Sequence, residues 1–216
     1  MSRFIQKIKR GSLTTGVALL SAGLGNRIRS NEPRSLIKIG GKCLLELQLE
    51  ALSSMFSEPN ILVGIGVESQ KIVKKFIGRV RLVENQLYKT TGPFETLRLL
   101  VNSSTDDSLL VIHGDLYFNS NILDGADFSK SFVVSDTTGS ILEREVGITS
   151  VINKELSMLR SLCCKSNDDS KHLLTFEIIN SIINKGGSFK VHKPDKTFIV
   201  EIDCMKDIKN ENFNIK

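Results

Sequence analysis

A glycine-rich turn follows an apolar segment near the amino-terminal end of the chain and leads into fixed cations. After the apolar residues 17–20 come Gly23, Gly25 and Arg27. Glycine allows successive amide N–H groups to converge on an anion, and the arginine guanidinium matches phosphate oxygens. The spacing fits neither a P-loop, which needs a lysine followed by serine or threonine, nor a dinucleotide fingerprint, which needs a third glycine. The turn therefore predicts a phosphate site of another kind.

Two aspartates that follow apolar runs could hold a metal ion. Asp115 comes after the apolar residues 109–112, a histidine and a glycine, and Asp203 comes after residues 198–202. Magnesium is held by a few carboxylates together with phosphate oxygens and water, so two acids from separate strand ends suffice. Each aspartate could instead cap the following turn or helix. Their presence together with the glycine-rich turn favours the metal site.

Residues 17–36 resemble the signature of the nucleotidyltransferases that make activated sugars and alcohols from a nucleoside triphosphate and a phosphomonoester. That signature is an apolar strand, Ala-Gly-x-Gly-x-Arg, then Pro-Lys and a leucine. Here Ser21 stands at an alanine position and Arg34 at the lysine position. Asn85, the segment 88–92 and Asp203 make the chain most similar to the phosphocholine cytidylyltransferase-like branch. The resemblance runs from about residue 17 to about residue 210.

The resemblance implies a fold and a set of site residues. The fold is α/β: one Rossmann-like (GT-A) nucleotidyltransferase domain over residues 17–210 with a mainly parallel central sheet flanked by helices, a basic tail at 1–16 and a tail at 211–216. Asp115 and Asp203 would hold Mg²⁺. Arg27 and Arg34 would be catalytic, and family pattern selects Arg34 over Lys38 as the cation that faces the triphosphate. The residues expected to bind the nucleotide are Leu20, Ala22, Gly23, Leu24, Gly25, Asn26, Asn85, Gly92 and Thr96.

The activity implied is transfer of a nucleoside monophosphate to a phosphorylated alcohol or sugar with release of pyrophosphate, with CTP expected first. An acceptor phosphate is already ionised, so alignment and charge neutralisation suffice without a nucleophilic device. One alternative is a sugar-1-phosphate nucleotidyltransferase that uses UTP, dTTP or GTP. Another is a non-catalytic nucleotide-binding relative. The arginine at position 34 keeps that last alternative open, and the presence of both aspartates argues against it.

Composition and charge favour an ordinary globular domain. The chain has 216 residues, 40% of them hydrophobic, and a formal net charge of +5. The lysines and arginines of residues 71–81 alternate with apolar residues at helical spacing, which indicates a solvated helix face, so nucleic acid is not an expected partner. No apolar run is long enough to span a membrane. Four cysteines without metal-ligand or disulfide spacing are expected to be reduced, which predicts a cytoplasmic location.

Apolar periodicity predicts strands that alternate with helices, and hence a parallel sheet whose ligands gather at the carboxyl ends of its strands. Strands are expected at residues 17–21, 61–67, 80–83, 109–113, 132–135, 146–151, 188–191 and 198–202, and helices at residues 43–56, 70–77, 94–101, 154–162 and 173–184.

Overall fold

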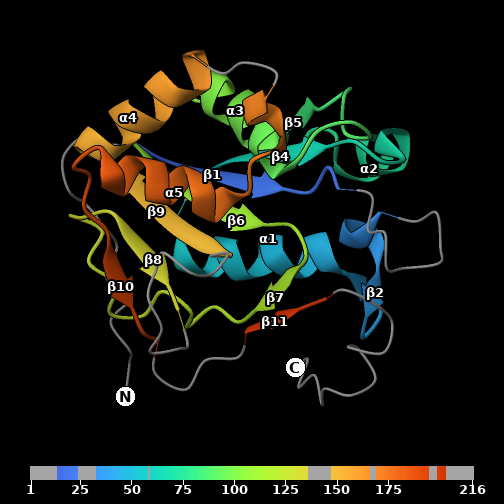
Figure 1. Cartoon of the computed structure of the whole chain (residues 1–216). Coiled ribbons are helices and arrows are strands. Elements are labelled where there is room, and N and C mark those ends of the chain that lie inside the picture. Colours follow the sequence, from blue (N-terminus) through green and yellow to red (C-terminus); the bar gives the residue numbers. More distant parts are fainter. Residues whose placement is uncertain are drawn as a thin grey trace, which may run out of the picture.

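The computed structural model describes residues 14–23, 33–57, 59–135, 147–165, 169–194 and 199–202. Within them, helices and strands alternate along most of the chain (Figure 1). The strands are β1 (Thr15–Leu20), β2 (Lys38–Ile39), β3 (Lys42–Cys43), β4 (Asn60–Ile65), β5 (Arg81–Glu84), β6 (Ser108–His113), β7 (Leu116–Phe118), β8 (Phe132–Val134), β9 (Ile148–Ile152), β10 (Lys190–His192) and β11 (Ile199–Glu201). The helices are η1 (Arg34–Leu36), α1 (Leu44–Met55), α2 (Ser69–Phe76), α3 (Pro93–Ser103), α4 (Asn153–Cys164), η3 (Asp169–His172) and α5 (Thr175–Asn184).

The described strands form a seven-stranded sheet in the order β10-β8-β9-β6-β1-β4-β5. β1 lies inside the sheet, next to the central strand β6, and pairs in parallel with both β4 and β6. The β4–β5 and β8–β10 pairs are parallel too. β9 runs antiparallel to β6 and β8. The mainly parallel sheet predicted from the sequence is therefore confirmed. Two short ladders, β2–β3 and β7–β11, lie beside it.

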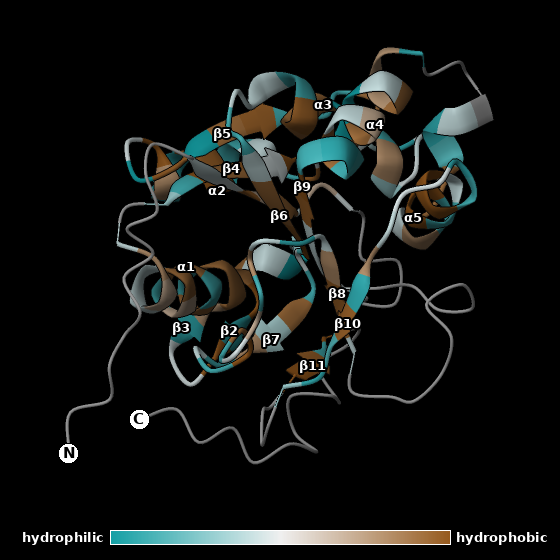
Figure 2. Cartoon of the chain, turned by 90° about the vertical axis from the view of Figure 1, so that its left-hand side faces the viewer, coloured by the Kyte–Doolittle hydropathy of each residue, from teal (hydrophilic) through white to brown (hydrophobic). Residues whose placement is uncertain are grey.

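Alternate residues of the central strands face two different helical layers. Val17 and Leu19 of β1 belong to a hydrophobic cluster with α1 and α2, whereas Ala18 belongs to a second cluster with α3, α4 and α5. This follows from the strand period of two residues, which sends neighbouring side chains to opposite faces. Figure 1 shows α1 on one side of the sheet and α3, α4 and α5 on the other, and Figure 2 shows the apolar strands β6 and β9 between these layers.

A carboxylate, that of Glu46, caps the amino-terminal end of helix α1. The Glu46 side chain accepts a hydrogen bond from the Cys43 backbone N–H at 2.9 Å and lies 2.8 Å from the Lys75 Nζ of α2. These two contacts lower the pKa of Glu46 to about 2, the lysine contributing most. Leu45, Leu49 and Leu52 lie on the buried side of the same helix. The amphipathic pattern and this polar start thus place α1 against the sheet.

Most predicted elements are found with small shifts of their ends. The first strand starts two residues earlier than predicted, at Thr15, and the last helix starts at Thr175 rather than at residue 173. The β2–β3 hairpin and β7 are not predicted from the sequence, because their strands have only two or three residues. In the part of the chain that the structure describes, no helix is long and apolar enough to cross a membrane.

Candidate active site

The carboxyl ends of β1 and β6 lie side by side because these strands are paired in parallel. Leu20 of β1 faces His113 of β6 in the register, and the Gly114 N–H donates to the Leu20 carbonyl at 3.0 Å. A Cβ at position 114 would lie 2.6 Å from that carbonyl oxygen and would also collide with the Ser21 side chain. Glycine at this position therefore allows the two chains to approach, and it brings Asp115 beside the start of the glycine-rich turn.

Asp115 forms an ion pair with Arg34. The Arg34 Nη1 lies 2.5 Å from the Asp115 Oδ2, and the two side chains are 22% and 20% exposed. The residues are 81 positions apart in the sequence. Arg34 is the first residue of η1, whose Ser35 and Leu36 are buried. The structure thus brings together the predicted phosphate-binding cation and one of the predicted metal ligands.

The strand that leads to Asp203 also reaches Asp115. β11 pairs antiparallel with β7, and the Ile202 N–H donates to the Asp115 carbonyl at 2.8 Å. Ile202 is fully buried. The residue that immediately precedes Asp203 therefore lies against the backbone of Asp115, although Asp203 itself is outside the described residues.

The donor chemistry at Asp115 fits a divalent cation. Its carboxylate is a hard oxygen donor of the type that magnesium takes, and a cation, the Arg34 guanidinium, already lies against it. Among the described residues, no three histidine, cysteine, aspartate or glutamate side chains gather as a metal cluster. A cation at Asp115 would therefore need further oxygen ligands besides this carboxylate.

Five predicted site residues lie outside the described residues, so the structure does not test their placement. Of the predicted turn, Leu20, Ala22 and Gly23 are described. The Ala22 carbonyl accepts from the Val67 N–H at 3.4 Å, and the Ser21 N–H donates to the Gly64 carbonyl at 2.9 Å. The five residues outside the description are Leu24, Gly25, Asn26, Arg27 and Asp203.

Asn85 organises the loop that follows β5. Its side chain is 1% exposed, and its amide nitrogen lies 3.2 Å from the Thr91 hydroxyl and 3.1 Å from the Thr96 hydroxyl. Its carbonyl oxygen accepts from the Leu87 N–H at 2.9 Å. Both the amide nitrogen and the carbonyl oxygen of Asn85 therefore have hydrogen-bond partners within the protein. These bonds hold residues 85–92 against α3. Direct contact of Asn85 and Thr96 with a nucleotide stays a prediction.

Gly92 is the point where a segment from the second half of the chain joins this loop. Its N–H donates to the Lys171 carbonyl at 2.8 Å, and a Cβ here would lie 2.7 Å from the His172 carbonyl oxygen. The first turn of α3 is attached in the same way, since the Phe94 N–H donates to the Leu173 carbonyl at 3.2 Å. Glycine at position 92 therefore admits η3 to the amino-terminal end of α3.

Tyr88 lies beside the predicted site, although its position in the sequence predicts no role for it. A Cβ on Gly66 would lie 2.7 Å from the Tyr88 Cβ and 2.6 Å from the Ala22 carbonyl oxygen. The base of the tyrosine side chain therefore rests on Gly66, next to the glycine-rich turn. The signal that could have indicated this contact is a glycine directly after the apolar residues 61–65, together with the short spacing between Asn85 and Tyr88.

The histidine and cysteines at these positions do not form a nucleophilic device. The His113 Nε2 lies 3.0 Å from the Thr175 hydroxyl, so this imidazole has a structural partner on α5. Burial raises the pKa of Cys163 to about 12, which disfavours the reactive thiolate. Cys43 is buried, and burial raises its pKa as well. Cys204 lies outside the described residues.

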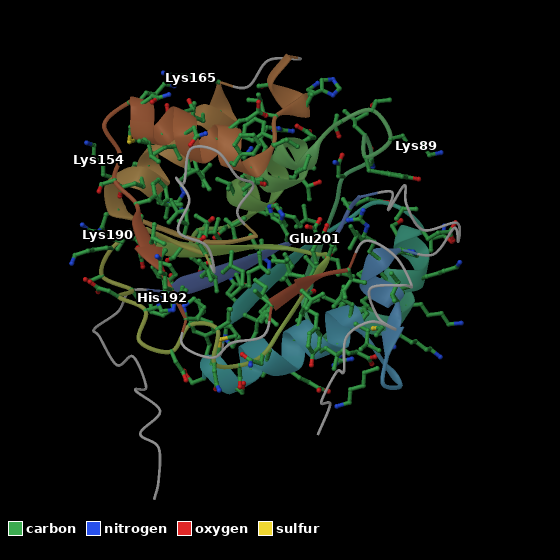
Figure 3. The ribbon with its side chains drawn as sticks, turned by 60° about the horizontal axis from the view of Figure 1, so that its bottom comes forward. Lys89, Lys154, Lys165, Lys190, His192 and Glu201 are labelled. Carbon is green, nitrogen blue, oxygen red and sulfur yellow. The ribbon has the colours of Figure 1, made fainter. Side chains whose placement is uncertain are left out.

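The lysines of α2 form the predicted solvated face. Ile72 and Phe76 are fully buried on one side of the helix, while Lys71 pairs with Glu68 at 3.2 Å on the other. Figure 3 shows other lysines at separate places around the rim: Lys89, Lys154, Lys165 and Lys190.

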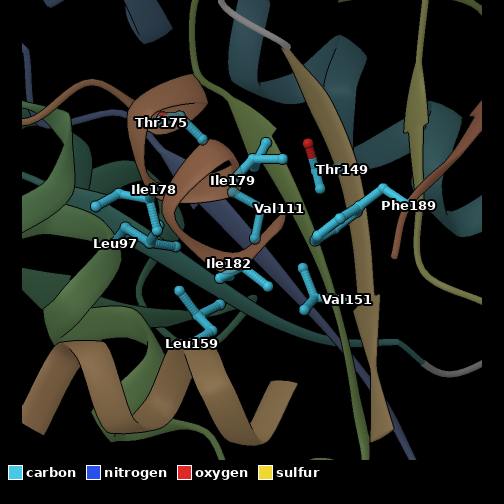
Figure 4. Close-up of a pocket in the computed structure, with 10 residues that line it drawn as sticks. All are labelled: Leu97, Val111, Thr149, Val151, Leu159, Thr175, Ile178, Ile179, Ile182 and Phe189. Carbon is cyan, nitrogen blue, oxygen red and sulfur yellow. The ribbon is translucent and has the colours of Figure 1, made fainter. Parts of the chain in front are cut away.

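A small cavity lies between the sheet and helices α3, α4 and α5 (Figure 4). Its volume is about 10 Å³, roughly that of one water molecule's probe sphere, so it is a packing void rather than a substrate site. Its lining is almost wholly apolar. The residues around it are Leu97, Val111, Thr149, Val151, Leu159, Thr175, Ile178, Ile179, Ile182 and Phe189.

Solved structures share this fold over nearly the whole chain. The CTP:phosphocholine cytidylyltransferase of Streptococcus pneumoniae matches with a TM-score of 0.73 at 22% identity, covering 92% of this chain and 97% of that one. The inositol-1-phosphate CTP transferase of T. maritima matches with a TM-score of 0.69 at 16% identity, covering 92% of both chains. A putative glucose-1-phosphate thymidylyltransferase of Bacillus anthracis gives 0.73 at 14% identity, covering 91% of this chain and 93% of that one. At these identities the likeness shows the fold.

Sequence relatives are longer than this chain. The Bifunctional protein GlmU of Methanococcus vannielii is 28% identical over 176 residues, which are 79% of this chain but only 40% of that protein. A probable UDP-N-acetylglucosamine pyrophosphorylase of Encephalitozoon cuniculi is 40% identical over 50 residues, 23% of this chain and 15% of that protein. The family model described as the MobA-like NTP transferase domain matches residues 17–164, more than half of the chain. The resemblance predicted from the sequence is confirmed at this level: the chain belongs to the family of MobA-like NTP transferase domains.

Proposed function

We propose that the protein transfers a nucleoside monophosphate from a nucleoside triphosphate to a phosphorylated alcohol or sugar and releases pyrophosphate. The observation that carries the proposal is the meeting of Arg34 and Asp115 at the strand ends where the family's phosphate-binding turn begins. An oxygen of the acceptor phosphate forms a bond to the α-phosphorus as the bond from that phosphorus to the bridging oxygen of the leaving pyrophosphate breaks. Two polyanions must meet in this step, so it needs concentrated positive charge.

The chain's own residues would supply binding and alignment. Gly23 and Arg27 would bind the triphosphate through amide N–H groups and a guanidinium, and Arg34 would neutralise phosphate charge. Asp115 and Asp203 would hold Mg²⁺, which supplies charge stabilisation on the phosphate oxygens. The acceptor phosphate is ionised at neutral pH, so no general base is required, and His113, paired with Thr175, has no task in the step.

CTP is our first choice of nucleotide. Two of the structural neighbours, the pneumococcal and T. maritima proteins, are described as acting with CTP. The motifs around Asn85 resemble the phosphocholine cytidylyltransferase-like branch. A sugar-1-phosphate nucleotidyltransferase that uses another base is the second candidate. It is favoured by the relative in Encephalitozoon cuniculi, which is described as a UDP-N-acetylglucosamine pyrophosphorylase.

The test is a screen for pyrophosphate release with magnesium present. CTP, UTP, dTTP and GTP are each combined with a panel of phosphorylated alcohols and sugar 1-phosphates. We expect turnover with CTP and a phosphorylated alcohol, and turnover with UTP and a sugar phosphate would select the second candidate. Nucleotide binding without pyrophosphate release across the whole panel would show a non-catalytic relative instead.

A further inference from the structure

The Arg34–Asp115 pair joins two groups that the proposed reaction needs for different partners. The guanidinium is expected on phosphate, and the carboxylate is expected on a cation. Yet the Arg34 Nη1 and the Asp115 Oδ2 are 2.5 Å apart, and each side chain is about four-fifths shielded from water. A carboxylate in such surroundings is costly to leave without a counter-ion. Arg34 therefore supplies the positive charge at Asp115 when no other cation does so.

The backbone that carries Arg34 is firmly held, so a change of partner requires only side-chain rotation. In η1 the Leu36 N–H donates to the Pro33 carbonyl at 2.9 Å, and the Ile37 N–H donates to the Arg34 carbonyl at 3.0 Å. Ser35 is 1% exposed beside it. The long arginine side chain has several rotatable bonds and a planar fork that fits both carboxylate and phosphate. It can exchange one anion for the other while η1 stays in place.

We propose that Arg34 is a shared counter-ion that couples the binding of nucleotide to the binding of the divalent cation. Without substrates it neutralises Asp115. When a triphosphate arrives, Arg34 turns to the phosphates and leaves the carboxylate open to the cation, so each ligand favours the binding of the other. This inference rests on the proposed function, because it takes Asp115 as a cation ligand and Arg34 as a phosphate ligand.

The first experiment measures Mn²⁺ binding to the full chain without nucleotide, by the electron paramagnetic resonance signal of free Mn²⁺. Arg34→Gln removes the competing charge and should tighten Mn²⁺ binding about fivefold, the scale of one partly exposed ion pair. Arg34→Lys keeps the charge and should stay near wild type. Lys38→Gln, which removes an exposed positive charge four residues along the chain, controls for the general field of the protein.

The second experiment measures the binding of CTP and UTP in EDTA by titration calorimetry. Asp115→Asn releases Arg34 and should tighten metal-free nucleotide binding, again about fivefold. The same substitution in an Arg34→Gln background should change affinity much less, because no guanidinium remains to be released. This non-additivity separates a shared counter-ion from the simple loss of a negative charge.

The outcomes distinguish the inference from the proposed function. If Asp115→Asn abolishes Mn²⁺ binding but Arg34→Gln binds Mn²⁺ no tighter than wild type, the shared counter-ion is wrong and the metal site stands. If the effects of Asp115→Asn on nucleotide binding are equal in both backgrounds, the shared counter-ion is wrong as well. If Asp115→Asn leaves Mn²⁺ binding unchanged, Asp115 is not a cation ligand. The shared counter-ion is then wrong, and the proposed function no longer includes Asp115 in its metal site.

Discussion

The carboxylate of Asp115 stands where three separate parts of the chain meet. It follows β6, pairs with Arg34 of η1, and belongs to the residue whose carbonyl accepts from Ile202 after β11. Contacts from several elements therefore position this strand end. The proposed transfer needs charges that are already in place, because it forms no covalent enzyme intermediate and depends on alignment and charge stabilisation.

Replacing either predicted metal ligand should stop turnover without unfolding the protein. We expect Asp115→Ala and Asp203→Ala each to lower the rate of pyrophosphate release by at least about 100-fold, the scale of a lost electrostatic contact in a transition state. Asp107→Ala is the matched control. Asp107 lies just before the other end of β6, where its carboxylate accepts from the Thr14 N–H at 2.9 Å.

Circular dichroism should show an intact fold in all three variants. If Asp115→Ala or Asp203→Ala keeps near wild-type turnover at saturating magnesium, the substituted aspartate is not a metal ligand. An equal loss of turnover in Asp107→Ala would attribute the effect to stability.

Among the elements, the junction of α1 and α2 is held by one carboxylate. Glu46 contacts Lys75 at 2.8 Å and the Cys43 N–H at 2.9 Å, which together lower its pKa from 4.5 to about 2. A depressed folded-state pKa stabilises the fold above the unfolded value near 4.5. That contribution is lost as pH falls from about 4.5 through about 2.

The pH dependence of unfolding by urea should therefore differ between wild type and Glu46→Gln. At pH 7 we expect wild type to be more stable by about 1 kcal/mol, after allowance for partial exposure of the pair, and the gap to narrow steadily at pH 3 and below. Glu50→Gln is the control, because the Glu50–Lys42 pair is about half exposed on both sides. A constant gap across this range would contradict the assignment of the contacts.

The cavity behind the sheet contains a matched pair of threonines. The Thr149 hydroxyl on β9 is buried without a hydrogen-bond partner among the described residues, whereas the Thr175 hydroxyl on α5 is 3.0 Å from the His113 Nε2. Both residues are 2% exposed. We expect Thr149→Val to raise the free energy of unfolding by about 1 kcal/mol and Thr175→Val to lower it by about 1 to 2 kcal/mol. Thermal or urea unfolding would measure both, and the opposite ranking would show that the Thr149 hydroxyl has a partner.

Element types were predictable from the sequence because apolar periodicity decides them. Runs such as residues 109–113 and the spacing within α1 carry that signal, while β2, β3 and β7 are too short to show any period. The site was predictable only in part. Asp115 and Arg34 came from motif spacing and resemblance, but their mutual contact spans 81 positions and depends on tertiary packing. The inward direction of the Asn85 side chain is likewise set by Thr91 and Thr96.

At the scale of the whole molecule, the sheet separates two hydrophobic clusters that should respond independently to mutation. Ile72 of α2 belongs to one cluster and Ile182 of α5 to the other. Each Ile→Val change should cost about 0.5–1.5 kcal/mol. The double variant should cost their sum within about 0.5 kcal/mol, because the two sites share no neighbours across the sheet.

The control for this additivity is a pair on one face. Ile178 and Ile182 lie one turn apart on α5 and line the same cavity. Their double variant should depart from the sum, because one relaxed side chain changes the space available to the other. Additivity in this pair together with coupling across the sheet, both measured by urea unfolding, would contradict the two-cluster description.

The stability of the β7–β11 ladder sets the fraction of molecules in which the backbone around Asp115 is held in place. The ladder has three residues on each strand and lies outside the seven-stranded sheet, so it should open at a lower free energy than β1 or β6. Each opening frees the Asp115 carbonyl and detaches the strand that leads to Asp203. The apparent affinity for substrates is then the intrinsic affinity multiplied by the fraction of molecules with the ladder closed. Faster amide hydrogen exchange at Ile202 than at Ala18 would report that fraction, and any ligand that bridges the two aspartates would slow it.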